Sequence, residues 1–370
     1  MESAEPESDR RENPPSAPPV SRSGNPQTPA NHLNRQADAI TTPHTAYPDR
    51  ATRGRRRPQI VNPELGTRER LTFYLMTGLV HLFSLLPDFV LYPLGILGGY
   101  IGYLLDGRHV AIGMRNLAVA FPERSVEQRR RILRASYINL GRSGAEYVRL
   151  GGFFYKRLKK RVTYERFAYW EELRQLHPGK GALVLSAHFG NFELFAPAHA
   201  LHGHQISLVH HTQRFLAGDA LLCFARERAG VKILRKHAAA RAVLKELRQG
   251  NLVGIPFDQN AKRSEAIFVP FFSEIAATSS GLARLVAHSG APVVPAFIVR
   301  QPDQRSHRIE IFDEIPIQRS ADSGADIAEN TRRFVKAIED VVRRYPEQFL
   351  WTHRRYRTRP VRGTPSIYDT

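Results

Sequence analysis

Short apolar runs alternate with longer segments of helical pattern from Ala182 to Arg343, and this alternation constrains the fold most. The runs have the length and the β-branched residues of buried strands. Those that predict strands are 182–185, 206–210, 231–234, 252–257, 293–300 and 308–312. The segments that predict helices are 217–229, 238–248, 278–288 and 326–343. The pattern favours an α/β fold with a mixed, mostly parallel sheet flanked by helices, and with functional groups at the carboxyl ends of the strands.

His188 directly follows the first of these strands, and Glu193 comes five positions later at the start of a predicted helix, for which Asn191 or Ser186 can serve as the cap. In one continuous helix, residues five apart point about 140° away from each other. If Gly190 lets the chain turn sharply, Glu193 can bond one imidazole nitrogen and leave the other as a base toward a hydroxyl. The pair predicts a catalytic dyad, and the alternative is a histidine with a structural role only.

Asp258 and Gln259 follow another predicted strand and predict either a site for sugar hydroxyls or a loop cap. The sequence contains no phosphate-binding Gly-Lys-Ser loop, no zinc-type cysteine pair and no Gly-x-Ser-x-Gly turn. Cys223 is the only cysteine, so we expect a buried apolar side chain rather than a nucleophile. His210 and His211 lack carboxylates at metal spacing and are expected to be structural. We therefore expect neither a metal nor a cofactor.

Residues 1–65 hold 11 of the 25 prolines and no apolar run, a composition that predicts a disordered tail. The next part, 66–107, contains the apolar stretch Leu71–Leu105, which only Asp88 interrupts with a charge. This stretch predicts a membrane anchor, either a single span or a partly inserted hairpin. A pair of core helices under the catalytic domain is the alternative.

Residues 108–180 carry most of the surplus positive charge, with 17 Lys or Arg against six Glu. Two runs stand out, RRR at 129–131 and KRLKKR at 156–161. Such runs attract lipid phosphates, nucleic acid or an acidic protein, or they form a solvated helix face. They lack the interleaved aromatic residues and the zinc spacing of nucleic-acid modules, so we expect no nucleic-acid partner. Next to an apolar stretch, they favour anionic lipid headgroups.

Several motifs together resemble those of the late acyltransferases of lipid A biosynthesis, the lauroyl and myristoyl transferase family. They are RNLAVAFPE (115–123), HFGNFE (188–193), PFDQ (256–259), VPFFSEIAATSSGLARLVAHSGAPVVPAF (269–297) and YPEQFLWTHRRYRTRP (345–360). The resemblance runs from about Arg68 to Pro360, and the last of these segments is its most specific signature.

The resemblance implies a glycerolipid-acyltransferase-like catalytic domain at 108–360, with a C-terminal tail at 361–370. It also implies a bacterial inner-membrane enzyme that faces the cytoplasm. Such an enzyme moves a fatty acyl chain from acyl carrier protein, or from coenzyme A, to a hydroxyl of an acylated and phosphorylated glucosamine disaccharide. The thioester is then a co-substrate, and no cofactor is implied.

The resemblance also assigns roles to single residues. His188 matches the base of the family and Glu193 its partner, and Asp258 matches the acidic residue of the Asp-Gln pair. Arg226 or Arg228 matches an arginine-bearing segment near the site. The closing basic motif contains Arg354 and Arg355, which either contact substrate or have a structural role.

His211, Thr212 and Phe215 occupy positions at which the family usually has other residues, so the acceptor or the acyl length can differ. Two alternatives to a lipid A acceptor therefore stay open. One is an acyltransferase that acts on another membrane lipid, such as a phosphatidylinositol mannoside, an amino lipid or a lysophospholipid. The other is a basic, membrane-bound lipid-binding protein without catalytic activity.

Overall fold

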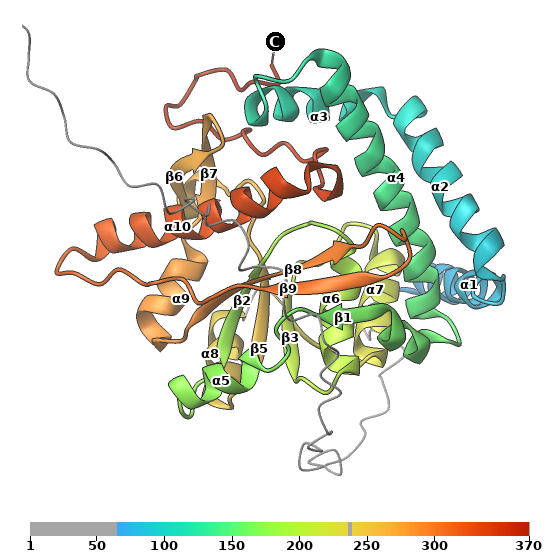
Figure 1. Ribbon diagram of the computed structural model, residues 1–370, viewed down its shortest axis with the longest axis horizontal. Helices are drawn as coiled ribbons and strands as arrows, with labels where there is room; N and C mark the ends of the chain where they lie inside the picture. The colour runs from blue at the N-terminus through green and yellow to red at the C-terminus, as the bar shows by residue number, and fades with distance from the viewer. Residues whose placement is uncertain (1–64, 236–238, 370) are drawn as a thin grey trace, which may run out of the picture. The chain divides into compact units, whose positions relative to one another are not determined.

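The structure is a computed structural model, which describes residues 65–235 and 239–369 (Figure 1). The chain divides into two units, and every described residue belongs to the second, Ala51–Thr370. The tail predicted at 1–65 lies outside the described residues, except for Leu65.

Seven strands form one sheet in the order β1-β9-β8-β2-β5-β3-β4. They are β1 (Val162–Tyr164), β2 (Ala182–Ser186), β3 (Ile206–His210), β4 (Lys232–Arg235), β5 (Leu252–Pro256), β8 (Val293–Arg300) and β9 (His307–Ile311). Neighbouring strands are parallel except β8 and β9, which are antiparallel. The predicted mixed, mostly parallel sheet is thus confirmed, and the six predicted strands differ from the observed ones by one residue at most at either end.

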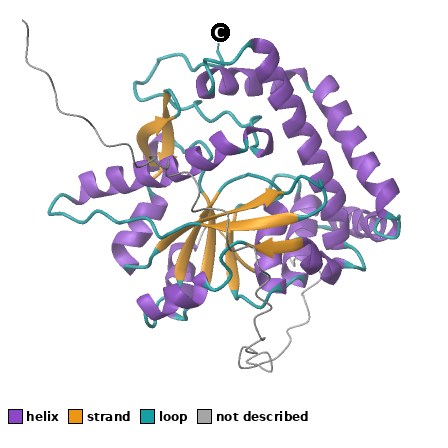
Figure 2. Cartoon of the chain, viewed as in Figure 1, coloured by secondary structure: helices purple, strands orange, loops and turns teal. Residues whose placement is uncertain are grey.

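Helices cover both faces of the sheet (Figure 2). One face packs against α8 (Ala239–Arg248), α9 (Gly281–Ser289) and α10 (Ser323–Arg344), and the other against α5 (Tyr169–Leu176), α6 (Phe192–Leu201) and α7 (Leu216–Arg228). In β2, Leu183 and Leu185 belong to the first core, whereas Ala182 and Val184 belong to the second. Successive side chains of a strand point to opposite faces, so a strand covered on both faces must be apolar throughout.

Four helices precede the sheet: α1 (Thr67–Phe83), α2 (Asp88–Leu105), α3 (Gly107–Ala120) and α4 (Val126–Gly151). In Figure 1, α2 runs beside α4. Glycines make this approach close, because a Cβ added at Gly141 would lie 2.1 Å from the carbonyl oxygen of Gly95. Helix α2 is long and apolar enough to cross a membrane, and only 17% of it is buried. This low burial favours the predicted membrane anchor over the alternative of core helices for α2.

The structure differs from the predicted pattern at a β-hairpin and at the first residue of the helix that follows it. Strands β6 (Ala266–Phe271) and β7 (Glu274–Ser279) pair antiparallel, and α9 begins at Gly281, so the helix predicted from Thr278 starts too early. The hairpin was missed because Phe272 takes the positive φ, 55°, that Asn or Gly usually supplies in such a turn. Three 3₁₀ helices complete the described elements: η2 (Tyr155–Arg161), η4 (Arg263–Glu265) and η5 (Pro346–Gln348).

The segment predicted as a C-terminal tail, 361–370, is held against the core in its described part. Tyr368 is buried, its hydroxyl donates to Asn116, and it accepts from the backbone N–H of Tyr356 at 3.2 Å. The C-terminal residues therefore contribute to the packing of the same unit.

The turn at Gly190 generates a prediction about stability. Gly190 has φ +60°, and a Cβ there would lie 1.8 Å from the carbonyl oxygen of Ile298. We expect Gly190→Ala to lower the free energy of unfolding by about 3 kcal/mol or more, because strain and overlap add. Gly179 also has positive φ, +73°, but open space around it, so Gly179→Ala should cost only about 1 kcal/mol. Denaturant unfolding of both variants measures the difference, and equal losses would contradict the steric reason.

Candidate active site

The loop after β2 carries His188 and is held from two directions. The backbone N–H of Leu350 donates to the carbonyl of His188 at 3.0 Å, and the N–H of Gly190 donates to the carbonyl of Gln348 at 2.8 Å. Asn191 caps α6, because its side-chain oxygen accepts from the N–H of Leu194 at 3.2 Å. The cap predicted at Asn191 is confirmed. The imidazole of His188 therefore stands on a rigid loop at the carboxyl end of a central strand.

A buried carboxylate orients this imidazole. Asp258 follows β5, the parallel neighbour of β2, and its Oδ1 accepts from Nδ1–H of His188 at 2.9 Å and from the backbone N–H of His188 at 3.1 Å. Nε2 is then the unprotonated nitrogen, which can accept a proton. Burial alone lowers the pKa of His188, but the charge and the hydrogen bond of Asp258 outweigh burial, so the pKa is raised. The same interaction lowers the pKa of Asp258 against its own burial.

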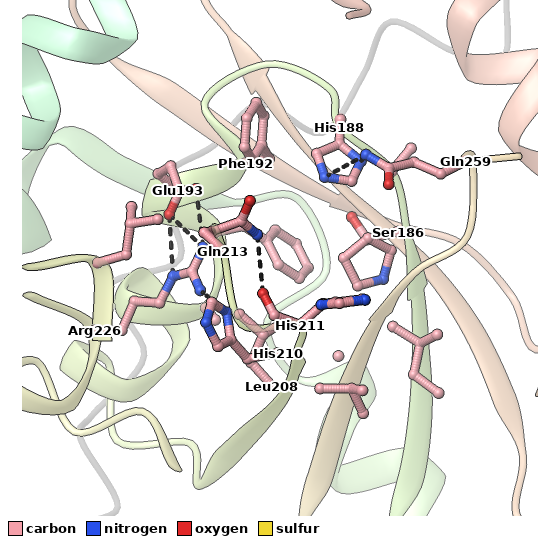
Figure 3. A pocket seen from close by; sticks show the side chains of 18 residues that line it. Ser186, His188, Phe192, Glu193, Leu208, His210, His211, Gln213, Arg226 and Gln259 are labelled. Atoms are coloured by element: carbon pink, nitrogen blue, oxygen red, sulfur yellow. Dashed lines mark hydrogen bonds and ion pairs between the residues drawn. The ribbon is translucent and has the colours of Figure 1, made fainter. Parts of the chain in front are cut away.

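The predicted hydrogen bond between His188 and Glu193 is wrong. Within the described residues, the carboxylate of Glu193 is held by Arg226 of α7, with Nε at 3.0 Å and Nη2 at 2.7 and 2.9 Å. The remaining Nη1 lies 3.1 Å from Nδ1 of His210. A two-pronged hydrogen bond from a guanidinium cation is stronger than one from a neutral imidazole. Glu193, in the first turn of α6, therefore binds Arg226 of α7. Figure 3 shows His188 beside Gln259 on one side and the Glu193–Arg226–His210 cluster on the other.

Both clusters border one cavity of about 470 Å³. Its apolar lining comes from α6, α7, β3 and β5 and includes Phe192, Phe195, Ala196, Leu208, Leu222 and Ile255. Its polar lining includes Ser186, His188, Glu193, His210, His211, Gln213, Arg226 and Gln259. The cavity has both apolar and polar walls, and its size and converging polar groups are typical of a small-molecule site.

Two other predicted residues contribute differently. Gln259 lies at the cavity, with its amide nitrogen 3.3 Å from Nε2 of His188. Arg228 does not line the cavity, because it donates to the carbonyl of Gly151 at 3.0 Å and stacks over Tyr155. Of the two arginines in the ARERAG segment, the structure thus brings Arg226 to the cavity.

Arg354 and Arg355, in the basic C-terminal motif, contact the core and not the cavity. Arg354 stacks over the ring of Tyr368 and does not line the cavity. Arg355 is buried and donates to the carbonyls of Ala277 at 2.7 Å and Gln259 at 3.3 Å. Its position favours the structural alternative for this motif, because it fixes the loop that carries Asp258 and Gln259.

The structure also brings together His210, Asp219 and Cys223, whose ligand atoms lie within 4.8 Å of one another. Sequence reasoning missed the carboxylate, because Asp219 reaches His210 only when α7 folds back onto β3. Arg226 bonds the same histidine and Arg235 lies 3.8 Å from Asp219, and these two cations oppose a metal ion. Burial raises the pKa of the Cys223 thiol to about 11, so it is not a thiolate nucleophile at neutral pH.

Comparison with known proteins gives one consistent result. The family model described as bacterial lipid A biosynthesis acyltransferase matches residues 60–358. A lipid A biosynthesis lauroyltransferase of Escherichia coli (strain K12) is 30% identical over 298 residues, which cover 80% of this chain and 94% of that protein. A palmitoleoyltransferase of the same strain is 28% identical over 294 residues (79% and 92%), and a myristoyltransferase is 25% identical over 272 residues (74% and 81%).

The geometry at His188 predicts how its proton affinity responds to substitution. Asp258→Asn removes the charge that raises the pKa of His188, so the pKa should fall. Glu193→Gln removes a carboxylate charge that raises the pKa of His188 less than Asp258 does, so the pKa should fall by less. The rate of modification by diethyl pyrocarbonate, followed by mass spectrometry of the His188 peptide across a pH series, measures both pKa values. An unchanged value in Asp258→Asn would contradict the assigned hydrogen bond.

Proposed function

The chain belongs to the bacterial lipid A biosynthesis acyltransferases, and from this we propose that it transfers a fatty acyl chain from a thioester donor to a hydroxyl of a lipid A precursor, with His188 as general base. As an O-acyltransferase of this family the chain is an enzyme, so the alternative of a non-catalytic lipid-binding protein is set aside. The observation that carries the proposal is an oriented imidazole, held by a buried carboxylate, that borders a cavity with both apolar and polar walls.

The reaction needs one proton acceptor and no acyl-enzyme. Nε2 of His188 takes the proton from the acceptor hydroxyl while the hydroxyl oxygen attacks the thioester carbonyl. The tetrahedral intermediate then collapses, the carbon–sulfur bond breaks, and the proton passes from His188 to the leaving thiolate. Asp258 stabilises the imidazolium that exists between these steps, which is the orienting role of the acid in a catalytic triad.

Glu193 has a different role in this proposal from the direct partner that the motif predicted. Its charge also raises the pKa of His188, although less than the charge of Asp258 does. Its bond to Arg226 ties α6 to α7 across the cavity. We propose that Glu193 and Arg226 maintain the shape of the cavity walls. The charge of Glu193 also helps to keep the imidazole basic, whereas the charge of Arg226 acts in the opposite direction.

The donor and the acyl length are finer parts of the proposal. An acyl group on acyl carrier protein or on coenzyme A would enter the cavity that contains His188 with its thioester at the imidazole. Both carriers are negatively charged and would be attracted by the net charge of +19 on this chain. His211, one of the positions that differ from the family pattern, lines the cavity. It therefore stands where it can contact the acyl chain or the acceptor sugar.

We propose that α1 and α2 attach the enzyme to the cytoplasmic face of the bacterial inner membrane. Both helices pack on the domain along one side and expose large apolar residues on the other. Among these are Leu71, Leu75, Leu79, Leu82, Phe89, Leu94, Leu97, Ile101, Leu104 and Leu105. Because Gly95 and Gly99 hold α2 against α4, the helix lies on the catalytic domain with its exposed face free to enter lipid.

An acyl-transfer assay in detergent micelles tests the function. Wild type should acylate a phosphorylated glucosamine disaccharide precursor from an acyl thioester, and mass spectrometry detects the product. We expect His188→Ala to lose about 10²–10⁴-fold in turnover, because general base assistance is lost. His288→Ala replaces an exposed histidine on α9 and should keep full activity.

Two outcomes would contradict the proposal. Full activity in His188→Ala would remove the assigned base. Transfer by wild type to a phosphatidylinositol mannoside, an amino lipid or a lysophospholipid, but not to the disaccharide, would replace the acceptor.

The membrane assignment makes a separate prediction. The double variant Leu97→Asp and Leu104→Asp places two charges on the exposed face of α2, at a cost of up to about 3 kcal/mol for each charge in lipid. It should move from the membrane to the soluble fraction with unchanged circular dichroism. Leu176→Asp alters an equally exposed leucine on α5 and should stay with the membrane. Equal partitioning of the two variants would contradict the assignment.

A further inference from the structure

A second cavity, of about 370 Å³, lies under the turn between α1 and α2. Its charged lining consists of Asp88, Arg149, Arg157 and Arg161, which come from α2, α4 and η2. Among the described residues, none lines both this cavity and the one that contains His188. We call it the turn pocket, and the proposed acyl transfer gives it no role.

The turn pocket has a surplus of positive charge that the fold holds in place. Arg149 binds one carboxylate oxygen of Asp88 at 2.7 Å, and Arg161 binds the other. Arg149 also donates to the carbonyl oxygens of Ser84 and Leu86, which fixes it under the turn. Two guanidinium groups thus share one carboxylate, and with Arg157 the charged lining of the pocket has two positive charges in excess.

Arg157 supplies a cation without a carboxylate partner. Its side chain is exposed, and its guanidinium carbon lies 4.4 Å from the centre of the Phe154 ring. In the described residues no ion pair includes Arg157. A planar guanidinium stacked on one face keeps its N–H groups available at the edge, where they can bind two oxygens of one phosphate.

The surroundings of the turn pocket indicate where such a phosphate comes from. Three large apolar side chains adjoin the pocket and expose more than half of their surface: Leu85 lines it, and Phe89 and Phe153 are next to lining residues in the sequence. Lys156, Lys159 and Lys160 are exposed on the same 3₁₀ helix as Arg157. Apolar side chains next to a basic run form the pattern of a protein surface that rests on anionic lipid, with the cations at headgroup level.

We propose that the turn pocket binds the headgroup phosphate of an anionic membrane phospholipid. Arg157 provides the N–H groups that bind the phosphate oxygens. Arg149 and Arg161, which Asp88 holds in place, add positive charge to the pocket. The exposed apolar residues of the α1–α2 turn enter the acyl region beside the bound lipid. The bound phospholipid would set the depth and the orientation of the enzyme at the bilayer. The occupant is a phospholipid rather than the acceptor, because the acceptor hydroxyl must reach His188 in the other cavity.

Vesicle binding of the full chain tests the proposal without any need for turnover. Dissociation constants are measured by sedimentation with neutral phosphatidylcholine vesicles and with vesicles that also contain phosphatidylglycerol. Wild type should prefer the anionic vesicles. Arg157→Gln should bind them more than about tenfold more weakly, because it loses both the cation, worth about fivefold at a membrane surface, and the two-pronged bond to the phosphate. It should bind neutral vesicles as wild type does.

Two matched variants separate a pocket from diffuse attraction. Lys160→Gln removes the same charge from the same 3₁₀ helix but does not line the turn pocket, so it should weaken binding by about fivefold at most, the effect of the charge alone. Arg157→Lys keeps the charge and loses the fork, and should fall between wild type and Arg157→Gln. Equal losses in Arg157→Gln and Lys160→Gln would overturn the proposal, because they would mean that only net charge matters.

The acceptor is the rival occupant, and kinetics without phospholipid distinguish it. In detergent micelles, Arg157→Gln should show the same KM for the disaccharide acceptor as wild type. A raised KM combined with unchanged vesicle binding would assign the turn pocket to a phosphate of the acceptor and overturn the proposal.

Discussion

The rest of the structure depends on the hydrogen bonds and ion pairs of one carboxylate, that of Glu146. It is buried in α4 and binds Arg300 of β8 at 2.6 and 2.9 Å, His307 of β9 at 3.1 Å, Tyr92 of α2 at 3.1 Å and Asn191 at 2.6 Å. Burial disfavours this charge, but His307 and Arg300 outweigh it and lower the pKa of Glu146 to about 2. Removing one partner of such a buried pair costs about 3–5 kcal/mol, so a single charge holds the sheet, the apolar helix and the cap of α6 together.

The loop that carries His188 gains its rigidity from this network. Asn191 both caps α6 and binds Glu146, and the C-terminal segment holds the other side of the loop through Gln348 and Leu350. The imidazole of His188 can then be oriented by Asp258 without movement of the backbone. Rigid support of this kind is what proton transfer requires, because a small displacement of the base reduces its rate strongly. The same network ties α2 to the loop through Tyr92, so the apolar helix and the site share one support.

Much of the fold followed from local pattern. The central strands are apolar along their whole length because both faces are covered, and this property is visible in a linear sequence. Helices such as α8 and α10 could also be predicted, since each buries one side and exposes the other. The hairpin of β6 and β7 could not, because Phe272 adopts a backbone conformation that its own preferences disfavour and that surrounding packing imposes.

For the site, the sequence by itself determined which residues are chemically able to act: a histidine after a strand, acids nearby and arginines in α7. Only the tertiary structure decided which acid serves the histidine. Asp258 is 70 positions from His188 but follows the neighbouring parallel strand, whereas Glu193 is five positions away and binds Arg226. The physical reason is that adjacent parallel strands end at the same edge of a sheet, so strand order, which no local pattern encodes, selects the partner.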